Sequence, residues 1–84
     1  MKNAKEMFEQ LGYEKYGNDP LSYRLDDGGY INFIDFIHIQ KTIRFREYEE
    51  YENNQPQGSF LLNIKELQAI NQQCKELGWL DEEI

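Results

Sequence analysis

The sequence predicts an α+β fold with two layers: an antiparallel meander of three to four strands, flanked by an N-terminal and a C-terminal helix packed on one face. Three observations support this fold class. Helix start and stop signals occur once near each end, apolar and polar residues alternate between them, and short turns separate those segments. We expect one domain, residues 1–84, because two hydrophobic cores do not fit into 84 residues.

The two predicted helices have the same residues at their beginnings and ends. Asn3 and Asn63 stand where an N-cap side chain accepts hydrogen bonds from free N–H groups, and a Glu follows three residues later, as in a capping box. Gly12 and Gly78 stand where a left-handed residue ends a helix, and an aromatic residue follows each. The predicted helices are Ala4–Leu11 and Ile64–Leu77.

Each predicted helix has an apolar stripe at helical spacing. The first stripe is Ala4, Met7, Phe8 and Leu11. The second stripe is Leu67, Ile70, Cys74 and Leu77, and we expect Glu66, Gln72, Gln73 and Lys75 to lie largely outside it.

Strands are predicted where apolar and polar residues alternate. Leu21–Leu25 alternates in this way, and Asp26–Gly29 then suits a hairpin turn, because Asp and Gly tolerate positive φ. Thr42–Tyr48 alternates again, with Ile43 and Phe45 expected against the helices and Arg44 and Arg46 on the other face. Replacing both arginines should therefore barely alter folding, because exposed charges contribute little.

Tyr30–Ile39 is the most β-prone stretch, but its alternation breaks. Phe33-Ile34 and Phe36-Ile37 place apolar neighbours on both faces. Either a bulge near Ile34-Asp35 resets the register, or this is a central strand covered on both sides.

Three other segments have weaker patterns. Glu14–Pro20 contains a cluster of turn formers and is predicted as a loop, and the polar stretch Glu49–Gly58 is predicted as a second loop. Ser59–Leu62 is a short apolar run, which we predict as a short fourth strand.

Composition narrows the class of protein. The net charge of −7 and pI near 4.6 oppose non-specific attraction to nucleic acid or anionic membranes. Cys74 is the only cysteine, which excludes an internal disulfide and fits a reducing compartment. The N-terminal residues lack the apolar region of a secretory signal, and no apolar stretch reaches the ~20 residues of a membrane span. We therefore expect a cytoplasmic protein with no membrane partner.

No residue pattern specifies a reaction, a metal or a cofactor. Asp35 and His38 are three apart, so on a regular strand they point to opposite faces, and only a bulged strand would let them share an ion. A small enzyme or metal protein built on these two residues is therefore the least favoured class. Cys74 lies on an apolar stripe, where a thiol behaves as a small hydrophobic group rather than a nucleophile. Asp26–Gly29 lacks the Gly-Lys-Ser/Thr pattern of a phosphate-binding loop. We expect no catalytic residue, no metal ligand, no cofactor and no enzymatic activity.

Arginines and aromatic residues provide the candidate binding surface. Arg24, Arg44 and Arg46 could form a basic stripe on the sheet, which would suit nucleic acid, or could be paired across strands with Glu47, Glu49 and Asp35. Given the net charge, nucleic acid is the less favoured partner. The chain also has twelve aromatic residues, more than a small core hides easily, and exposed aromatic residues beside Arg favour protein interfaces. The candidate partner-binding residues are Arg44, Arg46, Tyr48 and Tyr51. Phe60 and Trp79 are two further aromatic residues of interest, but they are not among these candidates.

The two ends resemble a known group of proteins. Leu67–Trp79, which ends Glu-Leu-Gly-Trp, resembles the C-terminal helix of small, acidic, uncharacterised proteins from Gram-positive bacteria and their prophages, and Ala4–Tyr13 is similar to their N-terminal helix. The middle, Leu21–Gly58, matches only as a strand pattern. These proteins have no established activity, so the resemblance implies no functional residue. It implies a small accessory protein of bacterial or prophage origin.

We therefore expect a non-enzymatic accessory protein that acts through protein–protein contact, either with another protein or by self-association. The alternative is a nucleic-acid-associated module that uses the basic stripe on the sheet.

Overall fold

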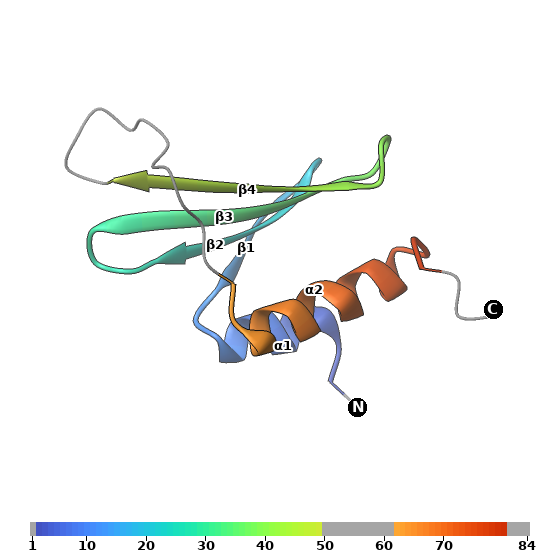
Figure 1. The fold of residues 1–84 in the computed structure, drawn as a ribbon, viewed down its shortest axis with the longest axis horizontal. Helices are drawn as coiled ribbons and strands as arrows, with labels where there is room; N and C mark the ends of the chain where they lie inside the picture. Colours follow the sequence, from blue (N-terminus) through green and yellow to red (C-terminus); the bar gives the residue numbers. More distant parts are fainter. Residues whose placement is uncertain (1, 50–61, 81–84) are drawn as a thin grey trace.

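A computed structural model describes residues 2–49 and 62–80. Within them, four antiparallel strands form a meander in the order β1-β2-β3-β4, and both helices pack together on one face of the sheet (Figure 1). This confirms the predicted α+β fold. The elements are α1 (Ala4–Gln10), β1 (Glu14–Asn18), β2 (Leu21–Asp26), β3 (Tyr30–Ile37), β4 (Thr42–Glu49) and α2 (Ile64–Glu76).

Both helices begin at the predicted residue and have the predicted caps, and each ends one residue earlier than predicted, with Leu11 and Leu77 as the C-caps. Asn3 accepts a hydrogen bond from the Glu6 N–H at 2.8 Å, and the Glu6 carboxylate accepts one from the Asn3 N–H at 3.0 Å; Asn63 and Glu66 repeat this capping box. At the other end of α1, the Tyr13 N–H donates to the Phe8 carbonyl at 3.0 Å, which is the long bond of a Schellman motif. Trp79 and Cys74 make the equivalent bond at 2.9 Å after α2.

Strand β1 lies where the sequence predicted a loop. Glu14–Asn18 pairs with β2, with a register shift between Lys15 and Gly17, and the Asp19–Pro20 turn joins the two strands. This strand is at the edge of the sheet and is mostly exposed, so it needs no apolar alternation. Its turn-forming residues therefore predicted a loop, although backbone pairing with β2 makes this segment a strand.

Strand β3 is central and buried on both faces, which confirms the second of the two predicted alternatives; the first, a bulge near Ile34-Asp35, is wrong. Its pairs with β2 and β4 run without a register shift. Ile34 and Phe36 belong to the core beneath the helices, while Phe33 and Asp35 lie on the opposite face. The break in alternation therefore comes from a strand that is buried on both faces.

The core lies between the helices and the sheet. The Phe8 ring stacks on the Tyr23 ring with centroids 4.0 Å apart, and Tyr13 contacts Phe8 edge-on at 5.6 Å, as its position after α1 predicts. The buried members of the core are Phe8, Tyr13, Tyr23, Ile34, Phe36, Ala69, Ile70 and Cys74.

The buried face of α2 differs from the predicted stripe. Leu67 is 52% exposed, whereas Gln73, expected outside the stripe, is buried. The Tyr23 hydroxyl donates a 2.6 Å hydrogen bond to the Gln73 side-chain oxygen. A polar side chain can face the core here because the sheet supplies its partner, which sequence periodicity does not reveal.

Two predicted segments fall mainly outside the described residues. Of the expected loop Glu49–Gly58, only Glu49 is described, and it belongs to β4. Of the expected strand Ser59–Leu62, only Leu62 is described, and it is not in a strand. Neither helix in the described part of the chain is long and apolar enough to cross a membrane.

Candidate partner-binding surface

The sheet has one face that neither helix covers, here called the open face. Strand alternation and the pairing of Arg24 with Phe33 and of Phe33 with Arg46 place these three side chains on it, in one row across β2, β3 and β4. Asp35 and Arg44 form the next row. All three arginines of the predicted basic stripe therefore share this face.

Asp35 is the centre of this surface. Its side chain is fully buried, although no helix covers it. Oδ1 accepts hydrogen bonds from the Ser22 hydroxyl at 2.7 Å and from an Arg46 terminal nitrogen at 2.9 Å. Oδ2 accepts from the Nε atoms of Arg44 at 2.8 Å and Arg46 at 2.7 Å. The arginines themselves cover the carboxylate.

These contacts determine the charge of Asp35. Burial alone would raise the pKa of this carboxyl group, but the hydrogen bonds from Arg46, Ser22 and Arg44 outweigh burial and lower the pKa. Asp35 is therefore an anion at neutral pH and holds both arginines on the open face.

The arginines are consequently less available than the sequence analysis expected. The Arg44 side chain is 52% exposed and that of Arg46 only 28%. Arg24 lies 3.4 Å from both Glu14 and Asp26. Each arginine of the stripe therefore has a carboxylate partner, and the expectation that Arg44 and Arg46 are dispensable for folding needs correction, because a buried anion depends on them.

Aromatic rings gather beside these arginines. The Arg46 guanidinium carbon lies 4.2 Å from the centroid of the Phe33 ring, so the cation covers this ring. Tyr16 and Tyr48 contact Phe33 edge-on, at centroid distances of 5.0 and 6.1 Å. A shallow groove of about 300 Å³ is lined by Tyr16, Arg24, Ile31, Phe33 and Tyr48.

Sequence reasoning found some of these residues and missed others. Tyr48 was a candidate and lies in the groove, whereas Tyr51, like Phe60, is outside the described residues. Tyr16 was missed because its strand was predicted as a loop. Its side chain is 62% exposed and lines the groove. Phe33 was assigned only to the sheet. The pairing signal that would have revealed Tyr16 is absent from local sequence.

The residues considered as metal ligands or as a nucleophile, Asp35, His38 and Cys74, do not form a common site. Asp35 lies on the open face, whereas His38 follows β3 and accepts a 3.2 Å hydrogen bond at Nδ1 from the Trp79 indole nitrogen. No three His, Cys, Asp or Glu side chains within residues 2–49 and 62–80 are placed to hold a metal ion. Cys74 is buried in the core, and burial raises the pKa of its thiol, so this residue is unsuited to nucleophilic attack.

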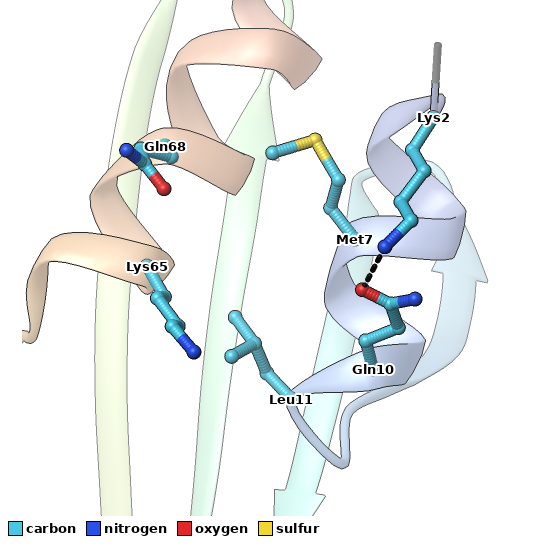
Figure 2. A pocket seen from close by; sticks show the side chains of 6 residues that line it. All are labelled: Lys2, Met7, Gln10, Leu11, Lys65 and Gln68. Carbon is cyan, nitrogen blue, oxygen red and sulfur yellow. Dashed lines mark hydrogen bonds between the residues drawn. The ribbon is translucent and has the colours of Figure 1, made fainter.

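A second hollow lies between the helices. Figure 2 shows Lys65 and Gln68 of α2 on one side and residues of or next to α1 on the other. Lys2 donates a 2.6 Å hydrogen bond to Gln10, and the volume is about 380 Å³. Its lining is Lys2, Met7, Gln10, Leu11, Lys65 and Gln68. This groove lacks the clustered aromatic rings of the open face.

Comparison of the chain with protein-family models, with curated proteins and with solved structures finds no match.

Proposed function

We propose that this protein is a non-enzymatic accessory protein of bacterial or prophage origin that acts in the cytoplasm through protein–protein contact at the open face. The observation that carries the proposal is the groove of Tyr16, Phe33 and Tyr48 beside arginines, on the face that the helices leave uncovered. Aromatic residues and Arg are enriched in protein interfaces and dominate their affinity. The single buried Cys74 thiol fits a reducing compartment.

Charge favours a protein over a nucleic acid as the partner. The rings of the groove could stack on bases, which keeps a nucleic-acid module as the alternative. Binding to phosphates, however, needs cations that are free to replace counterions. Here Arg24, Arg44 and Arg46 are matched by the carboxylates of Glu14, Asp26 and Asp35.

Capture from bacterial lysate with matched variants tests this proposal. Tyr16→Ala and Tyr48→Ala each remove one ring of the groove, and Tyr30→Ala removes an exposed tyrosine that does not line it. We expect a protein retained by the wild type and by Tyr30→Ala to be lost, at least tenfold, with either groove variant. Sedimentation of the wild type and the three variants tests self-association in the same way. An oligomer formed through the groove should be present in the wild type and in Tyr30→Ala and lost in Tyr16→Ala and Tyr48→Ala.

Equal capture by all three variants would place the contact elsewhere. The groove between α1 and α2 is then the next surface to examine, and Lys65→Glu reverses the charge on one of its walls. Circular dichroism of each variant ensures that a lost contact does not reflect an unfolded protein.

A further inference from the structure

We propose that the groove on the open face binds an uncharged, proline-rich segment of another protein in the polyproline II conformation. This inference rests on the proposed function, because it names the class of partner for the same surface. Three observations carry it: the spacing of the rings, the charge of the lining and a hydrogen-bond donor inside the groove.

The rings of the groove are spaced for a polyproline II helix. Tyr16 belongs to β1 and Tyr48 to β4, the first and last strands of the sheet, and Phe33 lies on β3 between them. The Tyr16 and Tyr48 centroids are 5.0 and 6.1 Å from that of Phe33, so the two outer rings are at most about 11 Å apart. A polyproline II helix has three residues per turn and rises about 3.1 Å per residue, so prolines three apart share one face at a spacing of about 9 Å. Two such prolines can therefore contact one tyrosine ring each.

The exposure of these rings also suits proline. Tyr16 is exposed and Tyr48 is half-buried, whereas Phe33 is buried and covered by Arg46. The groove therefore offers ring surfaces to a partner rather than a deep pocket for a long side chain. Proline presents a small apolar ring, and a preformed polyproline II helix loses little conformational entropy when it binds an aromatic-lined groove.

The charge of the lining favours an uncharged occupant. The net charge of −7 opposes an acidic segment. A basic segment would meet Arg24 in the lining and Arg46, whose guanidinium group already covers the Phe33 ring. The carboxylates of Glu14 and Asp26 neutralise Arg24, so the lining needs no opposite charge from a partner. A segment of proline and small uncharged residues meets these conditions.

Arg24 supplies a hydrogen-bond donor for the backbone of such a segment. Its two terminal nitrogens donate to Glu14 and Asp26 at 3.4 Å, and a guanidinium group has five N–H groups in all. The other N–H groups can donate to a carbonyl oxygen in the groove. The carbonyls of a polyproline II helix make no internal hydrogen bonds, whereas those of an α-helix are bonded within the helix. An added strand would bind at a sheet edge, and this groove lies on a face. The donor therefore favours polyproline II over a helix or a strand.

A second copy of the chain does not supply this segment. The sequence contains two prolines, Pro20 and Pro56, which are far apart in the chain. Pro20 lies in the turn between β1 and β2. Prolines three residues apart must therefore come from a different protein.

Titration with two peptides, followed by NMR, tests the inference on the wild-type protein. The probe is a capped peptide of three prolines and six serines with proline at every third position, and the control has the same composition with proline at every second position. We expect the probe to bind with a dissociation constant below about 1 mM, to shift the ring signals of Tyr16 and Tyr48, and to show upfield shifts of its own proline protons from ring stacking. The control should bind at least fivefold more weakly, because prolines two apart point to different sides of a polyproline II helix.

Matched variants then test the two tyrosine rings. Tyr16→Ala and Tyr48→Ala should each weaken binding of the probe at least fivefold, whereas Tyr30→Ala, which removes an exposed tyrosine outside the groove, should change it less than twofold. Equal affinity for the two peptides, absence of probe binding, or equal effects of the three variants would each overturn the inference. The peptide comparison uses the wild-type protein, so its outcome does not depend on the folding of a variant.

Competition separates this inference from the proposed function. Excess probe should release a partner that is captured through Tyr16 and Tyr48, and the spacing control should not release it. If a partner depends on both tyrosines but the probe does not release it, the proposed function stands and the proline-rich segment is wrong. An oligomer of the chain that depends on the same tyrosines would have the same meaning. If capture depends on neither tyrosine, the proposed function is wrong, and the peptide comparison alone decides what the groove binds.

Discussion

At the scale of single residues, Asp35 shows how a charge becomes buried without a second layer of structure. Its four hydrogen bonds come from Ser22, Arg44 and Arg46, and the guanidinium groups that neutralise it also exclude water from it. Removing one partner of a buried ion pair costs more than the pair contributes, because the remaining charge stays uncompensated. The two arginines should therefore differ in importance according to how many hydrogen bonds each supplies.

We expect Arg46→Ser to lower the free energy of unfolding by about 3 kcal/mol, because it removes two hydrogen bonds from a buried carboxylate and the cation that covers Phe33. Arg44→Ser, which removes one hydrogen bond from a half-exposed side chain, should cost about 1 kcal/mol. Urea denaturation of both variants measures the difference. Small and equal effects would mean that water replaces the arginines at Asp35.

The pH dependence of stability follows from the same carboxylate. The pKa of Asp35 is lowered in the folded protein, so its contribution to stability is fully present above the unfolded value of about 3.9 and is lost as pH falls through the folded pKa. The stability difference between the wild type and Asp35→Asn should therefore be constant above about pH 5 and shrink below about pH 4. Denaturation curves between pH 3 and 7 measure it, and a stability difference that is as large at pH 3 as at pH 7 contradicts the ionised assignment.

At the scale of elements, local signals predicted the helices well and the edge strand poorly. A capping box or a Schellman motif is complete within about six residues, so Asn3 and Gly12 reveal α1 by themselves. Strand β1 is defined by its pairing with β2, and the paired residues Glu14 and Arg24 are ten residues apart in the sequence. The residues of Glu14–Asn18 alone do not indicate that partner. The groove was accordingly predicted only in part, because Tyr16 belongs to that strand.

The two glycines that end the helices should respond differently to an added methyl group. Both have positive φ, 96° for Gly12 and 75° for Gly78, so alanine is strained at either position. A Cβ at Gly12 would also lie 3.1 Å from a methyl carbon of Leu25, whereas at Gly78 it would meet nothing within 4 Å. We expect Gly78→Ala to cost about 1 kcal/mol and Gly12→Ala measurably more, as judged by thermal or urea denaturation. A larger loss at Gly78 would contradict this assignment of the steric contact.

At the scale of the whole molecule, charge and shape separate the two faces of the sheet. Both helices cover one face and bury a core rich in aromatic residues, while the open face carries arginines that are paired with carboxylates (Figure 1). The chain as a whole carries a net charge of −7. Long-range attraction to a polyanion is therefore absent, although Arg24, Arg44 and Arg46 by themselves would form a basic stripe.

This charge balance leads to a test of the nucleic-acid alternative. We expect single-stranded DNA or RNA oligonucleotides to bind with a dissociation constant weaker than about 100 μM at 50 mM salt, since phosphate contacts by Arg24, Arg44 and Arg46 would compete with Glu14, Asp26 and Asp35. Fluorescence anisotropy across a salt series measures both affinity and its salt dependence. Glu14→Gln provides a sensitive control, because it leaves Arg24 with one carboxylate partner and should strengthen any phosphate binding. Micromolar binding by the wild type, with an affinity that falls as salt rises and is lost in Tyr48→Ala, would establish the open face as a nucleic-acid surface instead of a protein interface.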